Sequence, residues 1–72
     1  MFVQCNLQKG NVTEVSWIPE RYAVIGKFLK IKNSKDEWED GWQVTATFGK
    51  RLETEVIAAS QFYRHHREAT DI

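Results

Sequence analysis

Short runs of alternating apolar and polar residues, separated by glycine-bearing breaks, constrain this chain more than any other feature. Residues 2–8, FVQCNLQ, place Val3, Cys5 and Leu7 on one face of an extended strand and mainly amide side chains on the other. A Lys-Gly-Asn break follows, and residues 12–17, VTEVSW, alternate again. Two alternating runs joined by a short turn with glycine are typical of a β-hairpin, so strands are predicted over residues 2–8 and 12–17.

The chain changes character at Pro19, which lacks an amide hydrogen and favours a turn or the first position of a helix. We expect one helical turn over residues 19–23. Gly26 then permits a sharp change of direction, and residues 27–32, KFLKIK, alternate once more. This pattern predicts a third strand with a basic side.

A charged stretch separates the third strand from a fourth. Residues 33–41, NSKDEWEDG, are the most polar part of the chain and are expected to form a loop. Residues 42–48, WQVTATF, predict a strand whose inward face carries Trp42, Val44, Ala46 and Phe48. A glycine-bearing turn is expected to close it.

Residues 51–57 fit two structures. As a strand after a short turn, Leu52 and Val56 would continue the inward face of the fourth strand. As a helix, the same two residues would begin an apolar stripe that continues at Ala59 and Tyr63. We favour the strand, and in either case a helix is predicted near residues 58–68, ending before an extended tail.

These elements predict an α+β fold that is mainly β: one domain over residues 1–72, forming a small SH3-like barrel of about five antiparallel strands with a C-terminal helix. The alternative is a four-stranded antiparallel sheet packed by one longer C-terminal helix. At this length the core is small, so the large aromatic side chains are expected to supply much of it.

The charges of the chain balance, because ten basic and ten acidic residues give a formal net charge of zero. A general attraction to phosphate is therefore absent, and any nucleic-acid binding must come from a local patch. The single cysteine, Cys5, cannot form an internal disulfide, and no apolar run approaches the length that crosses a bilayer. We expect a cytoplasmic protein with no membrane contact.

Catalytic and metal-binding patterns are missing from the sequence. Cys5 falls on an inward strand face, as a core residue rather than a nucleophile would. His65 and His66 are adjacent, so on a helix they diverge by about 100° and cannot share one metal in the usual spacing. We expect neither an enzyme nor a cofactor or metal site.

Trp38 is the most informative single residue for function. It lies between Glu37 and Glu39, and an exposed tryptophan with an acidic rim is a common anchor of protein interfaces. These three residues are the candidate protein-binding site. The alternative is that Trp38 folds back over the barrel mouth and serves the core.

A second hypothesis is nucleic-acid binding through a basic strand and a helix end. Aromatic residues lie among the basic ones there, as in proteins that bind single strands. Lysines on an edge strand also protect against aggregation, and basic residues at a helix end complement its dipole, so both groups have structural explanations too. The candidate residues are Lys27, Phe28, Lys30, Lys32, Arg64 and Arg67.

Three segments, SWIPERYAVIGKFLKIK, DGWQV and SQFYRHHREATDI, resemble a group of small uncharacterised proteins encoded by tailed bacteriophages. The shared pattern is a Trp-Ile-Pro-Glu element, a Gly-Trp strand and a terminal Thr-Asp-Ile tail, and it covers residues 17–72. The resemblance implies expression in an infected bacterial cell. It leaves two kinds of role open, a binder of a host bacterial protein or a nucleic-acid accessory protein, and a homodimer formed through a strand edge is compatible with either.

Overall fold

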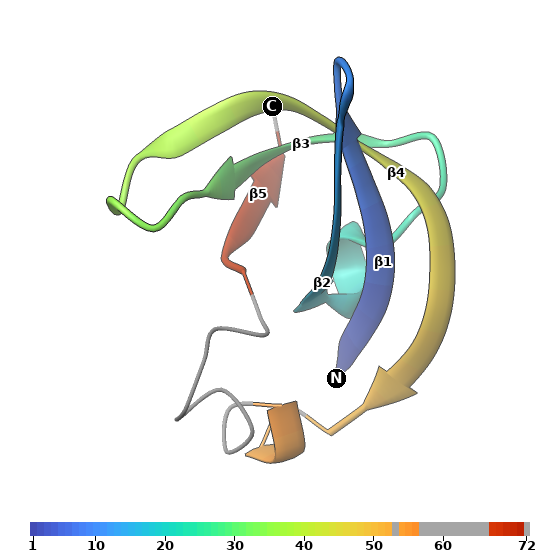
Figure 1. The fold of residues 1–72 in the computed structure, drawn as a ribbon. Helices are drawn as coiled ribbons and strands as arrows, with labels where there is room; N and C mark the ends of the chain where they lie inside the picture. The colour runs from blue at the N-terminus through green and yellow to red at the C-terminus, as the bar shows by residue number, and fades with distance from the viewer. Residues whose placement is uncertain (53, 57–66, 72) are drawn as a thin grey trace.

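The computed structural model describes residues 1–52, 54–56 and 67–71. Five antiparallel strands form one sheet in the order β2-β1-β4-β3-β5. They are β1 (Phe2–Lys9), β2 (Val12–Pro19), β3 (Phe28–Lys32), β4 (Trp38–Arg51) and β5 (Ala69–Asp71), and a 3₁₀ turn, η1 (Glu20–Tyr22), follows β2. The mainly β character predicted from the sequence is confirmed (Figure 1).

The first hairpin forms as its alternation predicts. β1 and β2 pair without interruption from Phe2↔Pro19 to Lys9↔Val12. Gly10 has a φ of 59°, which makes a two-residue turn possible there at no steric cost. Val3, Cys5 and Leu7 are buried, and on β2 the buried side chains are Ser16 and Ile18, so Val15 faces outward.

β4 is longer and more bent than its sequence indicates. Its first part pairs with β3 from Trp38 to Gln43, and its second part pairs with β1 from Gln43 to Arg51. Near Gly41, with a φ of 84°, two residues of β4 oppose one residue of β3, and the pairing with β1 is interrupted twice more. Such bulges increase strand twist, and β4 curves from one half of the molecule into the other in Figure 1.

Several predicted boundaries are therefore wrong. The loop expected over residues 33–41 ends at residue 37, because Trp38 already pairs with Lys32. The strand expected over residues 51–57 is not found among the described residues of that range, since β4 ends at Arg51 and residues 54–56 are helical. The helical alternative is correct for those three residues.

The C-terminal segment also differs from prediction. Most of the helix expected over residues 58–68 lies outside the described residues, but residues 67 and 68 are not helical. Ala69–Asp71 forms β5 against β3, which confirms the expected extended tail. The fifth strand thus comes from the tail, not from residues 51–57, and a four-stranded sheet is ruled out.

The core lies between the two halves that β4 connects. Each strand from β1 to β4 contributes, and residues of η1, its following loop and β5 pack against the cluster. The buried members are Val3, Cys5, Leu7, Ile18, Leu29, Ile31, Trp42 and Val44, with Tyr22, Ala23 and Ala69 partly buried beside them. Trp42 is inward as predicted, whereas Phe48 is 60% exposed and its predicted inward orientation is wrong.

The sheet is not closed, because β2 and β5 are its two edges. One residue, Arg67, connects them just before β5 begins. Its backbone N–H donates to the carbonyl of Trp17 on β2 at 2.9 Å, and its guanidinium reaches Glu14 of β2 and the carbonyl of Lys32 at the end of β3.

Candidate protein-binding face

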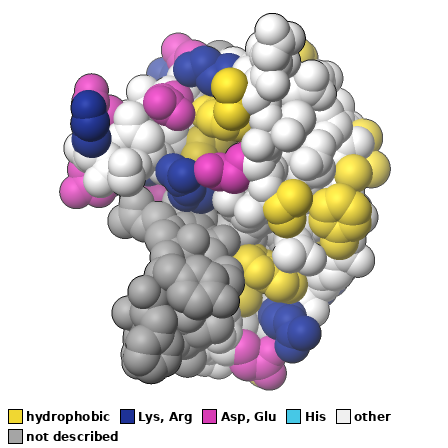
Figure 2. Space-filling model, in the orientation of Figure 1, with side chains coloured by type: hydrophobic (Ala, Val, Ile, Leu, Met, Phe, Trp, Pro, Cys, Tyr) yellow, Lys and Arg dark blue, Asp and Glu magenta, His cyan; other side chains and the backbone are white. Residues whose placement is uncertain are grey.

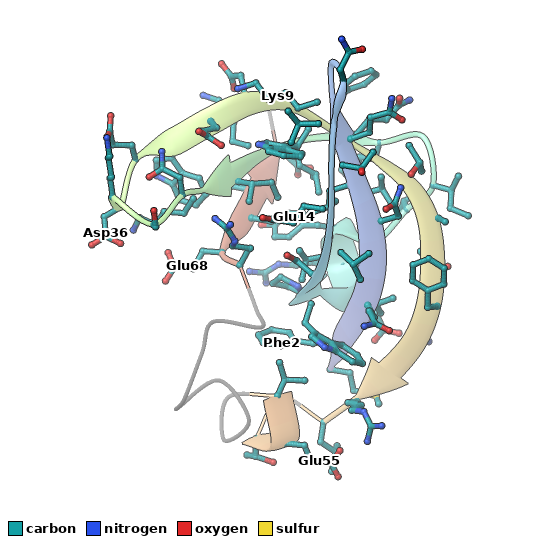
Figure 3. All side chains as sticks on the ribbon, in the orientation of Figure 1. Phe2, Lys9, Glu14, Asp36, Glu55 and Glu68 are labelled. Carbon is teal, nitrogen blue, oxygen red and sulfur yellow. The ribbon has the colours of Figure 1, made fainter. Side chains whose placement is uncertain are left out.

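The tip of the β3–β4 hairpin is fixed by one asparagine. The Asn33 side-chain oxygen accepts hydrogen bonds from the backbone N–H groups of Lys35 at 2.8 Å and Glu37 at 3.0 Å. Its backbone N–H donates to the Glu37 carbonyl at 2.8 Å. Asp36 takes a φ of 61°, a conformation that Asp tolerates better than most residues, and it lies at the tip of the hairpin in Figure 3. These contacts hold Trp38 immediately after an ordered turn.

The side of the hairpin that faces away from the core carries two exposed aromatic residues. Alternation along β3 buries Leu29 and Ile31 and turns Phe28, Lys30 and Lys32 outward. On β4, Trp38 and Asp40 share that side, because they contact Lys32 and Lys30 respectively. We call this surface the outer hairpin face: Phe28, Lys30, Lys32, Trp38 and Asp40.

Trp38 is the larger of the two aromatic residues, and 47% of its surface is exposed, against 52% for Phe28. The alternative in which Trp38 covers the core is therefore wrong. Lys32 lies opposite Trp38 in the ladder, and its Nζ is 5.4 Å from the centre of the indole ring. At this distance the ammonium is attracted to the ring face, which restricts the orientation of Trp38.

Three lysines on or next to β3 face carboxylates. Lys27 Nζ lies 2.8 Å from Asp71, Lys32 Nζ lies 3.2 Å from Glu68, and Lys30 Nζ lies 4.0 Å from Asp40. These pairs are largely exposed and contribute little to folding. They do cancel the local charge, so that a phosphate backbone approaching β3 would meet as many acidic as basic groups. On the face shown in Figure 2, basic and acidic side chains lie beside each other and neither forms a continuous patch.

The two glutamates beside Trp38 have different surroundings. Glu37 is exposed at the end of the turn. Glu39 is half-buried on the inner side, where its carboxylate accepts hydrogen bonds from the Asn33 amide at 3.4 Å and the Trp42 indole N–H at 3.2 Å. These hydrogen bonds, from Asn33 first and then Trp42, lower the pKa of Glu39 below its usual 4.5. Glu39 therefore supports the hairpin, while Glu37 remains accessible next to Trp38.

The structure places five of the six predicted nucleic-acid residues, and it brings Arg67 against Lys32, because Arg67 Nη1 donates to the Lys32 carbonyl at 3.0 Å. Lys27, Phe28, Lys30 and Lys32 lie along β3 and just before it. Arg67 is hydrogen-bonded at the edge of β2, with three contacts that leave little freedom for a ligand. Arg64, like His65 and His66, lies outside the described residues.

Cys5 is fully buried, and its Sγ contacts the Val3 carbonyl at 3.5 Å. Burial raises the pKa of the thiol to about 11, so that it is protonated and poorly reactive at neutral pH.

Within residues 1–52, 54–56 and 67–71, no three His, Cys, Asp or Glu residues gather in a way that could hold a metal ion. The described part of the chain also has no helix with the length and apolar character needed to cross a membrane.

Comparisons with protein-family models, curated proteins and solved structures gave no significant match. The proposed function is therefore based on the geometry of this chain. Four acidic residues that are central to that geometry, Glu14, Asp40, Glu68 and Asp71, were not among the candidates from the sequence. Of the ion pairs that these residues form, only Lys30–Asp40 could be predicted from the sequence, by aligning β3 with β4 across their hairpin.

Proposed function

We propose that this protein is a small non-enzymatic binding module that recognises another protein through the outer hairpin face, with Trp38 as the anchor. The observation that carries this proposal is the half-exposed indole of Trp38 on a hairpin whose turn is fixed by Asn33. Large rigid aromatic residues dominate binding energy at protein interfaces, because they bury much area and lose little side-chain entropy.

The surroundings of Trp38 support a protein partner. Phe28 is on the same side of β3 as Lys32, four residues away, which corresponds to roughly 13 Å along a strand. Two apolar anchors at this spacing, with lysine–carboxylate pairs between them, match the mixed composition of a non-obligate protein interface. Glu37 adds an accessible charge at the rim.

The framework of the module would be the SH3-like barrel expected from the sequence. The bend of β4 and the contacts of Arg67 between β2 and β3 support this assignment. The resemblance to bacteriophage proteins makes a host bacterial protein the expected partner and the bacterial cytoplasm the expected location. The buried, protonated thiol of Cys5 supports a non-enzymatic role.

Nucleic-acid binding is the less supported alternative. Lys27, Lys30 and Lys32 fit it by position, but each of them already faces a carboxylate. Phosphate contacts weaken steeply as salt concentration rises, whereas a largely apolar protein interface responds much less.

Affinity capture from bacterial lysate, with and without nuclease and at low and high salt, separates the two functions. The proposal expects a protein that is retained after nuclease treatment and at high salt, and that is lost when Trp38→Ala replaces the wild type. Phe48→Ala is the matched control, because Phe48 is an exposed aromatic residue of β4 outside the outer hairpin face. Recovery of nucleic acid alone, released by salt, would contradict the proposal.

A further inference from the structure

The two edge strands of the sheet, β2 and β5, differ in how well they are protected against pairing with a strand of another molecule. β5 has three residues, and its last residue, Asp71, is paired with Lys27. β2 has eight residues and pairs with β1 without a bulge. From Val12 to Ile18 it contains no lysine or proline, and its one charged residue, Glu14, is paired with Arg67, although charged side chains, proline, short length and bulges are the usual means by which proteins block edge strands.

The direction of the main-chain groups on β2 follows from its turn. In a two-residue hairpin the closing pair, here Lys9 and Val12, is hydrogen-bonded, and hydrogen-bonded pairs then alternate along the ladder. Thr13, Val15 and Trp17 therefore direct their N–H and C=O groups away from β1. The hydrogen bond from the Arg67 N–H to the Trp17 carbonyl agrees with this alternation.

The distal half of this edge is open in the described part of the molecule. Among the described residues, β2 pairs with β1 only, and Arg67 is the only residue that forms a backbone hydrogen bond with its outer edge. All residues from Gln8 to Thr13 are exposed. Val12 and Val15 are 59% and 54% exposed, and the hairpin tip stands clear of the other strands in Figure 1.

We propose that this edge pairs with the same edge of a second copy of the chain, antiparallel, with the two-fold axis at Thr13. Symmetric registers centred on Thr13, Glu14 or Val15 all use the outward main-chain groups of β2. A register centred on Glu14 places two like charges directly opposite each other, which is destabilising. A register centred on Val15 pairs Thr13 with Trp17, whose carbonyl is already bonded to Arg67. The register centred on Thr13 avoids both conflicts and places each Glu14 across from Val12.

The chemistry of the chain is compatible with self-association of this kind. The net charge is zero, so two copies do not repel each other. In this register only Val12, Thr13 and Glu14 of each β2 are paired, because residues 10 and 11 form the turn, and so short a pairing buries far less than the roughly 800 Å² per partner of a standard interface. The dimer is therefore expected to be weak and to increase with protein concentration. It uses β2 and leaves the outer hairpin face free, so it is independent of the proposed function.

Cysteine cross-linking tests the register directly. At a two-fold axis in a hydrogen-bonded pair, Thr13→Cys residues would have Cα atoms about 5.5 Å apart, within the range for a disulfide. In the same register Val15→Cys residues would be about 14 Å apart. Val24→Cys is the matched control, since Val24 is 54% exposed like Val15 but lies off the strand. The native Cys5 is fully buried and does not interfere.

Under mild oxidation, Thr13→Cys is expected to form the disulfide dimer about tenfold faster than either other variant, because only that pair satisfies disulfide geometry. Sedimentation of the wild type should show a dimer fraction that rises with concentration. Equal cross-linking by Val15→Cys or Val24→Cys would overturn the register. A wild type that stays monomeric at the highest soluble concentration, with no Thr13→Cys disulfide, would overturn the proposal.

Discussion

Arg67 and Glu14, 53 residues apart in sequence, form an ion pair across the open side of the sheet, with Arg67 Nη2 2.7 Å from Glu14 Oε1. The other carboxylate oxygen of Glu14 accepts a hydrogen bond from the buried Ser16 hydroxyl at 3.1 Å. Arg67 Nη1 donates to the Lys32 carbonyl at 3.0 Å. Glu14 points from β2 toward β5 in Figure 3. One guanidinium thus connects β2 with the end of β3 across the open side of the sheet.

This connection predicts a stability effect for Arg67→Ala. Both side chains are partly buried, and the change removes the hydrogen bonds from the guanidinium to Glu14 Oε1 and to the Lys32 carbonyl. Removing one member of a charge-assisted hydrogen bond in this setting should reduce the free energy of unfolding by about 1–3 kcal/mol. Urea unfolding measures this. Arg51→Ala is the control, because the Arg51–Glu55 pair is exposed and should change the free energy by less than about 0.5 kcal/mol. Equal effects of the two variants would show that Arg67 does not hold the edges together.

The hydrogen bonds to Glu39 predict a pH dependence of stability. Its pKa is lower in the folded state than its usual 4.5, so the ionised form stabilises the fold. This contribution is complete above about pH 4.5 and is lost as the pH falls through the lower folded value. Glu39→Gln, measured by urea unfolding from neutral to acidic pH, should be less stable than wild type at pH 7, and the difference should shrink at low pH. Glu20, whose pKa is lowered by Lys50, titrates in the same direction in both proteins and does not affect the comparison. A difference that is constant with pH would contradict this role.

The burial of Cys5 predicts a thiol that does not react in the folded protein. With a pKa of about 11 and no exposed surface, it should resist alkylation at neutral pH on the time scale in which an exposed thiol is fully modified. In concentrated guanidinium the same thiol should react at the rate of a model peptide. Mass spectrometry after timed iodoacetamide treatment measures both rates, and rapid native modification would show that the core opens locally.

The lysine–carboxylate pairs predict weak binding of nucleic acid by the wild type. Replacing two of the carboxylates, Asp40→Asn with Glu68→Gln, leaves Lys30 and Lys32 unpaired and adds two units of positive charge. The double variant should gain affinity for a labelled oligonucleotide at low salt, and the gain should disappear as salt rises. Fluorescence anisotropy measures this. Tight binding by the wild type, unchanged in the variant, would favour the nucleic-acid function instead.

The sequence predicts the local part of this fold well, because alternation with a period of two is a direct consequence of strand geometry. It correctly places β1, β2 and β3 and the turn after Pro19. It fails along β4, where Gly41 and Gly49 resemble turn signals although the strand continues through both. Bulges there accommodate extra residues, and a bulge has no distinct pattern in one sequence.

Some residues of the candidate site could likewise be predicted from the local sequence, whereas others could not. Trp38 and its exposed neighbour Glu37 could be found from composition, since a tryptophan among charges is unusual. The partners of Lys27 and Lys32 could not, because Glu68 and Asp71 reach them only through the pairing of β5 with β3. The sequence predicts Arg67 at a helix end in a binding patch, whereas its contacts with β2 depend on tertiary structure alone.

The central claim is that Trp38 is the anchor of a protein interface, and a direct binding measurement with a purified captured partner tests it best. Isothermal titration should compare wild type, Trp38→Ala and Phe48→Ala, after circular dichroism has shown that all three are folded. A central aromatic anchor contributes 2 kcal/mol or more, so Trp38→Ala should weaken binding by about thirtyfold, whereas Phe48→Ala should change it by less than about threefold. Equal affinity of Trp38→Ala and wild type would contradict the account.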